Sequence, residues 1–136
     1  MGKLNLEIIT PERVLESREV DAVIAPGTEG EFGILPGHIS FLSGIVPGEL
    51  RFLDRGKWEY VCVSTGFAEV SDDSVSVLVD SAERAANIYL PRAQAAMDRA
   101  KERLAKDRAN KEIDFLRAEN ALKRSIARIK VAKKIQ

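Results

Sequence analysis

The chain has 136 residues, of which 45% are apolar and 31% charged, a composition typical of a soluble globular protein with one main core. It contains no run of ~18 apolar residues that predicts a membrane span and no basic-then-apolar leader, so we expect an intracellular protein that reaches a membrane only through a partner. One cysteine and one histidine exclude an internal disulfide and cannot supply a structural zinc site.

Charge is divided between the two ends of the chain, although 21 basic residues balance 21 acidic ones in total. Residues 1–90 carry 7 Lys/Arg and 15 Asp/Glu, a net charge of −8, whereas residues 91–136 carry 14 and 6, a net charge of +8. Opposite charges favour docking of the second part on the first. They also leave a basic arm that an acidic partner can attract.

The first part of the chain has the alternation of β-strands. Residues 3–9 place Leu4, Leu6 and Ile8 on one face, which predicts a half-buried strand. Glycine-, aspartate- and serine-containing turns at 54–56 and 71–74 predict antiparallel hairpins. Many short strands without intervening helices favour a sandwich or a flattened barrel. The expected strands are 3–9, 19–25, 31–35, 49–53, 57–64, 67–70 and 74–79, with weaker candidates at 13–16 and 39–45.

Cys62 lies within one of these strands, where alternation puts it on the same face as Trp58 and Tyr60. A buried cysteine usually acts as a small hydrophobic side chain. We therefore interpret Cys62 as a packing residue and not as a nucleophile.

After residue 79 the apolar period becomes that of a helix. Ala93, Met97, Ala100 and Leu104 share one face, and Pro91 suits a first helical turn. Residues 106–111, which include the turn former Asn110, predict a short connection to a second helix. The apolar stripe expected on that helix comprises Phe115, Ala118, Leu122, Ile126 and Ile129.

These patterns predict an α+β chain, with an antiparallel β-sandwich domain of about ten strands over residues 1–85 and a two-helix hairpin over residues 86–136. The hairpin is built largely on alanine and has little apolar area to bury. We expect its docking to be marginal, as in an element that changes position.

Two local motifs suggest catalysis or phosphate binding only superficially. The glycine-rich segment 27–33 is followed by neither Gly-Lys-Ser/Thr nor a long helix, so its glycines are better explained by turns. His38 follows a Pro-Gly turn without the partners of a catalytic set, which favours a contact role.

The second helix carries a basic stripe, because Arg117, Arg124 and Arg128 fall on nearly one line along it. Residues 120–136 hold six Lys/Arg and no acidic residue. One explanation of this basic stripe is that its side chains are simply solvated at the C-terminal end of the helix, where the helix dipole favours positive charge. We expect no nucleic acid partner, because the total charge is neutral and no aromatic residues interleave with the basic ones.

Several separated motifs, in this order, resemble the epsilon subunit of the bacterial F-type ATP synthase. They are the segment 30–38 (Gly-Glu-Phe-Gly-Ile-Leu-Pro-Gly-His), the segment 66–70 (Gly-Phe-Ala-Glu-Val), the junction 82–85 (Ala-Glu-Arg-Ala) and the two-helix tail after it. The resemblance spans essentially the whole chain. It implies a non-catalytic central-stalk subunit whose ten-stranded sandwich joins the gamma subunit to the c-ring, coupling ion-driven rotation to ATP synthesis at the cytoplasmic face of the bacterial membrane.

The resemblance also implies roles for particular residues. Glu31 and Phe32 are expected to contact the c-ring, and His38 to lie near gamma or the ring. The hairpin is expected either to fold down on the sandwich or to extend along gamma and inhibit ATP hydrolysis. In the extended state its basic residues would meet acidic segments of the catalytic alpha and beta subunits; these residues are Arg124, Arg128, Lys130, Lys133 and Lys134.

The resemblance also implies ATP as a regulatory ligand. Some members of the family bind it through an Ile/Leu-Asp-x-x-Arg-Ala motif at the start of the first helix. Here Ile88, Tyr89, Arg92 and Ala93 occupy that location, with tyrosine in the aspartate position. The segment 113–118 (Ile-Asp-Phe-Leu-Arg-Ala) also fits the letters of this motif, but it lies on the second helix and so not at the family's location. Supporting residues are expected at Glu83, Arg99, Arg124 and Arg128.

No required cofactor and no metal site are implied. Two other classes stay open on the sequence: a free nucleotide-responsive sensor domain, and an enzyme, for which the residues supply no catalytic triad or metal cluster. A stalk subunit is distinguished from a free sensor by purification in a stoichiometric complex with gamma.

Overall fold

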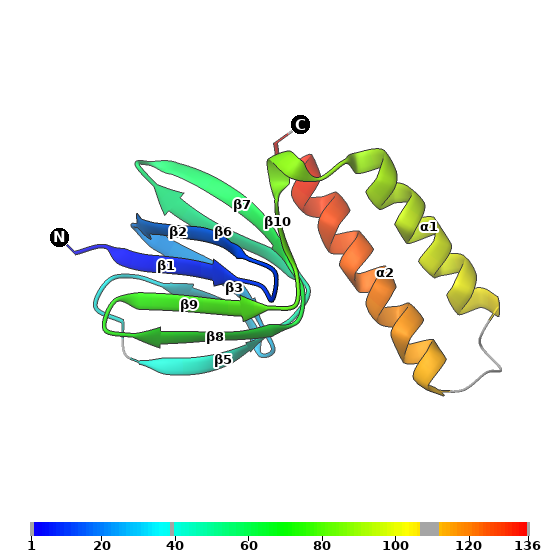
Figure 1. Cartoon of the computed structure of the whole chain (residues 1–136), viewed down its shortest axis with the longest axis horizontal. Coiled ribbons are helices and arrows are strands. Elements are labelled where there is room, and N and C mark those ends of the chain that lie inside the picture. The colour runs from blue at the N-terminus through cyan, green and yellow to red at the C-terminus, as the bar shows by residue number, and fades with distance from the viewer. Residues whose placement is uncertain (1, 39, 107–111, 136) are drawn as a thin grey trace.

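The computed structural model of the chain describes residues 2–38, 40–106 and 112–135. Within these residues, ten strands precede a short 3₁₀ helix and two α-helices (Figure 1), which confirms the expected fold class. The elements are β1 Leu4–Ile9, β2 Val14–Val20, β3 Ala22–Gly27, β4 Gly30–Ile34, β5 Phe41–Ile45, β6 Gly48–Asp54, β7 Lys57–Val63, β8 Gly66–Ser71, β9 Ser74–Val79, β10 Ala82–Arg84, η1 Ala85–Asn87, α1 Leu90–Lys106 and α2 Glu112–Lys133.

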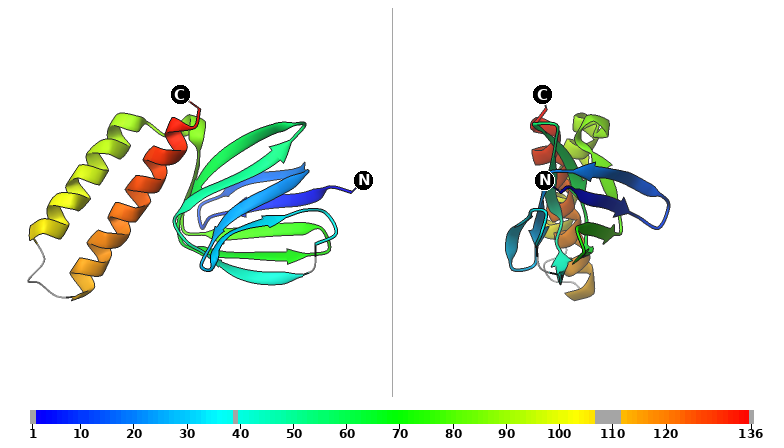
Figure 2. Two further views of the ribbon diagram at one scale, coloured as in Figure 1. Left: turned by 180° about the vertical axis from the view of Figure 1, so that it is seen from behind. Right: turned by 90° about the vertical axis from the view of Figure 1, so that its left-hand side faces the viewer.

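The strands are hydrogen-bonded in the order β10-β7-β6-β3-β5-β8-β9-β1-β2, and β4 pairs with β3. Figure 2 shows them curving around a common interior. One described pair, β1 with β9, is parallel, whereas the sequence predicted only antiparallel strands. A parallel pair joins segments that are distant in sequence, so no hairpin turn between them indicates the pairing.

The core of the sandwich is formed by alternate residues of its strands. In β1, Leu4, Leu6 and Ile8 are buried, as their alternation predicted. Phe52 of β6 is the bulkiest of the fully buried side chains. Burial of one such side chain stabilises a fold by about 1.5–3 kcal/mol. Among the residues that the structure describes, the contiguous core cluster contains none from either helix, so the sandwich does not need the hairpin to complete its interior.

Two details of the strands differ from the prediction. The segment 19–25 was predicted as one strand, but β2 ends at Val20 and β3 begins at Ala22, with a corner at Asp21. There the Asp21 amide donates to the Leu53 carbonyl at 2.8 Å. The three-residue β10, which pairs with β7, was not predicted because it is too short to show a period.

The hairpin lies at one end of the sandwich, and the N-terminal end of the chain lies at the other (Figure 1). Ala93 and Ala100 of α1 are buried, as predicted. On α2, Ala118 and Ile129 are buried, but the prediction for Ile126 was wrong, since it is 48% exposed. The expected connection at residues 106–111 falls largely, and the Phe115 side chain wholly, outside the described residues.

Ser125 is buried where the stripe predicted Ile126. Its hydroxyl donates to the Ala121 carbonyl at 3.0 Å, so the burial leaves no unpaired group on this side chain. The helix packs against both α1 and the strands β6 and β7, so its buried surface is wider than one apolar stripe.

We predict that a chain ending at Ala86 still folds. A second, smaller cluster joins the hairpin to the sandwich, and Cys62 and Ala85 are its buried members in the retained part. Exposing two small side chains costs about 1–2 kcal/mol, which lowers the melting temperature by roughly 5–10 °C. Circular dichroism with the strand signal and a cooperative melt confirms the boundary, whereas loss of the strand signal contradicts it.

Candidate functional site

A cavity of about 340 Å³ lies where the hairpin meets the sandwich. Two arginines of α1, Arg99 and Arg103, and two of α2, Arg124 and Arg128, line it. Within each helix the two arginines are four residues apart, which puts them on the same helical face. Glu83 of β10 is the acidic residue among the lining residues that the structure describes. The cavity therefore carries a surplus of positive charge.

Glu83 is bound by one of these arginines. The Arg128 Nε donates to Glu83 Oε1 at 2.7 Å, and Nη2 donates to Oε2 at 3.3 Å. This two-pronged geometry suits a guanidinium and a carboxylate. Both side chains are partly exposed, at 24% and 37%, so water screens the pair and its contribution to stability is modest. The pair links α2 directly to β10.

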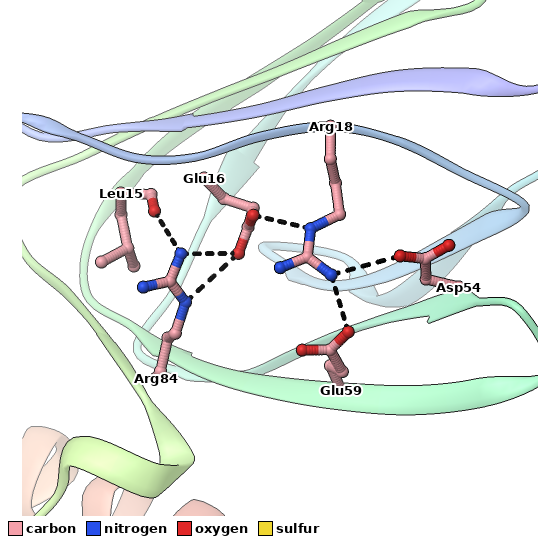
Figure 3. A network of polar contacts seen from close by, with 6 residues as sticks. All are labelled: Leu15, Glu16, Arg18, Asp54, Glu59 and Arg84. Atoms are coloured by element: carbon pink, nitrogen blue, oxygen red, sulfur yellow. Dashed lines mark hydrogen bonds and ion pairs between the residues drawn. The ribbon is translucent and has the colours of Figure 1, made fainter.

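The position of Glu83 depends on a polar network at its neighbour, Arg84 (Figure 3). Arg84 donates to the Leu15 carbonyl at 2.7 Å and to Glu16 at 3.0 Å. Because successive side chains of a strand point to opposite sides, fixing Arg84 toward β2 directs Glu83 toward the cavity. The network is thus a support for the site.

The same network continues from Glu16, which is buried, to the β6–β7 hairpin. Arg18 donates to Glu16 at 2.7 Å and to both Asp54 and Glu59, at 3.2 and 2.7 Å. The hydrogen bond that Arg18 donates to Glu16 is the main cause that raises the pKa of Arg18. Nothing in the sequence pattern indicated this network, because its members come from four separate strands, β2, β6, β7 and β10.

The other three arginines of the cavity, Arg99, Arg103 and Arg124, have no ion-pair or hydrogen-bond partner among the residues that the structure describes. All three are exposed, so solvent reduces their mutual repulsion. An anion held between α1 and α2 would replace that repulsion with charge-assisted hydrogen bonds. The arrangement can bind an anionic ligand.

The residues predicted for ATP binding separate into two groups. Glu83, Arg99, Arg124 and Arg128 line the cavity together. The four residues at the start of the first helix do not: Tyr89 is 68% exposed, Arg92 is exposed, and Ile88 and Ala93 are buried in the apolar contact between hairpin and sandwich. Arg103 was missed, although its spacing of four from Arg99 on the same helix could have indicated it.

Tyr89 is the N-cap of α1. The Ala93 amide donates to the Tyr89 carbonyl at 3.1 Å, and the first turn contains no acidic residue. The tyrosine side chain cannot accept a hydrogen bond from the free backbone amides of the first turn, as the side chain of aspartate or asparagine can. The tyrosine therefore leaves the start of α1 poorly capped.

We predict that Tyr89→Asp stabilises the helical hairpin by about 1 kcal/mol without any ligand, since aspartate both caps the helix and favours its dipole. A helical melt shifted upward by roughly 4 °C is the expected result. Tyr89→Asn, which caps without adding charge, separates the two contributions. A gain that appears only when ATP is present would instead assign the position to ligand contact.

Lys134, directly after α2, makes a second contact between the hairpin and the sandwich, in addition to the pair of Arg128 and Glu83. Lys134 Nζ lies 3.7 Å from Glu49 Oε1 and 5.7 Å from the centre of the Tyr60 ring. Glu49 Oε1 is buried without a hydrogen bond, whereas Oε2 accepts one from Arg51 at 2.8 Å. Of the predicted inhibitory residues, Arg128 and Lys134 therefore contact the sandwich, and Arg124 faces the cavity. Lys130 and Lys133 are exposed.

The predicted partner-contact residues also separate. Phe32 and His38 both pack on Phe41, at centroid distances of 5.4 and 5.0 Å, and form an aromatic cluster. Glu31 points to the opposite side of β4, where its carboxylate accepts hydrogen bonds from Arg51 at 3.0 and 3.2 Å. That hydrogen bond is the leading cause that raises the pKa of Arg51. Phe41 was missed as part of this surface.

No helix among the described residues is long and apolar enough to cross a membrane. In the same part of the chain, no group of three His, Cys, Asp or Glu side chains is arranged to hold a metal ion.

Comparison with known proteins gives the same assignment for both parts of the chain. Residues 3–85 match the beta-sandwich domain of the ATP synthase delta/epsilon chain, and residues 88–133 match its long alpha-helix domain. The ATP synthase epsilon chain of Nitratidesulfovibrio vulgaris (strain DP4) is 52% identical over 128 residues, covering 94% of each chain. That of Syntrophobacter fumaroxidans is 49% identical over 134 residues, covering 97% of each.

Solved structures agree in fold. A chain of the Euglena gracilis mitochondrial ATP synthase (OSCP/F1/c-ring) has a TM-score of 0.80 at 25% identity, covering 93% of this chain and 79% of that one. A chain of the Tetrahymena thermophila central stalk and c-ring structure, at 14% identity and a TM-score of 0.59 over 98% and 96%, supports the fold alone. With family matches over both the sandwich and the hairpin, the chain belongs to the ATP synthase delta/epsilon chain family.

Proposed function

We propose that the chain is a central-stalk subunit of a rotary ATP synthase, in which the sandwich joins gamma to the c-ring and the hairpin restrains ATP hydrolysis. The observation that carries the proposal is the family match over both the sandwich and the hairpin, with epsilon chains about half identical along nearly the whole length. The subunit is not itself an enzyme. It works at the membrane, on its cytoplasmic face, only as part of the complex.

For the sandwich, we propose that the surface around the aromatic cluster contacts the rotor. Leu35, which follows β4, is 62% exposed, and Leu42, on the opposite face of β5 from Phe41, is 67% exposed. Exposed apolar side chains are enriched at protein interfaces, so this edge of the sandwich is a candidate contact surface. Phe32 and His38 then contact the c-ring or gamma through this surface, while Glu31 contributes a charge at its side.

For the hairpin, we propose that the arrangement described above is the state that permits hydrolysis. Two of the basic residues that would inhibit the catalytic subunits, Arg128 and Lys134, are here paired with Glu83 and Glu49. Docking and inhibition therefore compete for the same charges. Release of the hairpin frees them to meet acidic segments of the alpha and beta subunits.

ATP is proposed as the ligand that favours the docked state. Its phosphates can bridge arginines of α1 and α2, and a ligand that binds one state preferentially shifts the population toward it. The structural basis is the surplus of guanidinium groups in the cavity between hairpin and sandwich.

The assembly is tested by co-expressing the chain with its gamma subunit and purifying through a tag on gamma. We expect recovery in a one-to-one ratio, which Leu42→Asp weakens and the exposed change Arg13→Ala, on the sandwich, leaves intact. A chain recovered free of gamma would favour an independent nucleotide sensor instead.

A further inference from the structure

We infer that Glu31, at the side of the surface proposed to contact the rotor, is coupled to docking of the hairpin through Arg51, a positioning residue that lies between Glu31 and Glu49. A rotor group that neutralises Glu31 then favours release of the hairpin. This inference rests on the proposed function, because it joins the surface assigned to the rotor to the element assigned to restraint of hydrolysis.

Four charged side chains form a continuous series from β4 to the end of the hairpin. Arg51 Nη1 and Nη2 donate to the two carboxylate oxygens of Glu31 at 3.0 and 3.2 Å. Nη1 also donates to Glu49 Oε2 at 2.8 Å. Lys134 Nζ lies 3.7 Å from the other oxygen of Glu49, Oε1. Arg51 therefore contacts both carboxylates, and Glu49 contacts the hairpin.

The strand β6 places this series beneath the docked hairpin. Phe52 is buried in the core, so alternation turns Arg51 and Glu49 to the outer face of the sandwich. The register of β6 with β7 sets them opposite Tyr60 and Cys62, which belong to the apolar cluster on which the hairpin packs. Since β4 pairs with β3 and β3 with β6, the series crosses from one side of this face to the other.

The sign of the coupling follows from the charges. Arg51 shares its positive charge between two carboxylates, so Glu49 keeps part of its negative charge to attract Lys134. When Glu31 is neutral, the charge of Arg51 acts on Glu49 alone. Arg51 can then also donate to Glu49 Oε1, which is buried without a hydrogen bond, and so compete with Lys134 for that oxygen. Both effects weaken docking.

Exposure decreases along the series in the direction that the inference requires. The side chain of Glu31 is 51% exposed and accessible to a partner, that of Arg51 is 26% exposed, and that of Glu49 is 8% exposed. Water and salt screen a buried charge less than an exposed one. A change at the accessible carboxylate therefore reaches a position where electrostatic interactions are stronger.

The test is the rate at which maleimide labels Cys62 in the full chain, because this thiol is buried beneath the hairpin. Glu31→Gln and Lys134→Gln are each expected to accelerate labelling about threefold, the scale of a partly exposed ion pair. Combined with Lys134→Gln, the change at Glu31 should add nothing, since the charge that responds to it is gone. A merely structural role of Glu31 would instead make the two effects multiply.

Arg51→Met tests the connection itself. In chains that carry it, Glu31→Gln should no longer change the labelling rate, because the side chain that contacts both carboxylates has been removed. Glu29→Gln, which removes the same charge from the exposed turn before β4, is the matched control and should leave the rate unchanged. An equal effect of Glu31→Gln with and without Arg51 would overturn the role of Arg51.

Failure of this inference can be told apart from failure of the proposed function. Faster labelling in Lys134→Gln with an unchanged rate in Glu31→Gln would overturn the coupling and leave the docked hairpin in place. The measurement uses the chain by itself, so it does not depend on assembly, whereas recovery of the chain free of gamma would overturn the proposed function. Effects of Glu31→Gln and Lys134→Gln that multiply would also overturn the coupling, without any change to Arg51.

Discussion

Deleting residues 88–136 is expected to raise ATP hydrolysis by the assembled enzyme about fivefold or more, the lower limit of a typical coupling between two sites. The deletion removes the basic segment that would enter the catalytic subunits, and it leaves intact the core cluster of the sandwich. Steady-state hydrolysis by complexes of equal subunit content measures the effect. An unchanged rate at every ATP concentration would show that the hairpin does not inhibit.

Point changes can locate the inhibitory contact without disturbing the docked state. Charge reversal at Arg128 would be ambiguous, because this residue also binds Glu83. Lys130 and Lys133 are exposed and are not among the residues that hold the sandwich. The double change to glutamate at these two positions should therefore raise hydrolysis. Lys101→Glu, on the exposed face of α1, is the matched control.

The opposite result is expected from Glu83→Gln. It removes the charge that binds Arg128 in the docked state, so the hairpin is released more often and hydrolysis decreases. Opposite signs for the lysine changes and for Glu83→Gln would identify a two-state switch. A common sign would mean that these residues act through assembly or stability.

Local patterns were sufficient to predict most of the fold. The alternation in β1 and the helical period from Ala93 to Ala100 reflect burial of one face of each element. Such burial can be predicted from the residues of the segment alone. The parallel pairing of β1 with β9 and the Glu16 network were not predictable, since they depend on which distant strands meet. The exposure of Ile126 was also missed, because α2 packs against two surfaces at once.

The candidate site was predicted only in part. Family resemblance named Glu83, Arg99 and Arg124, and the structure brings them to one cavity. It named Tyr89 and Arg92 on the strength of a motif at the start of the helix, whereas the structure gives position 89 the role of an N-cap. Sequence order alone does not show which side of a helix start faces a cavity.

Cys62 provides a direct measure of hairpin position. It is buried beneath the hairpin and lines the cavity, and burial, with a smaller contribution from Glu83, raises the pKa of its thiol to about 12. Only the thiolate reacts with alkylating agents, and each unit by which the pKa exceeds the pH reduces that form about tenfold. In the docked state the thiol should be nearly inert at neutral pH.

Ending the chain at Ala86 is therefore expected to accelerate maleimide labelling of Cys62 about a thousandfold, as exposure returns the pKa from about 12 toward its ordinary value of roughly 8.5–9. Glu83→Gln in the full chain should give an intermediate rate, and ATP should slow labelling of the unmodified chain if it favours the docked state as proposed. Because Cys62 is the single cysteine, Cys62→Ser verifies that the signal is specific. Equally slow labelling of the shortened chain would mean that the sandwich itself covers the thiol, and then the hairpin is not what protects it.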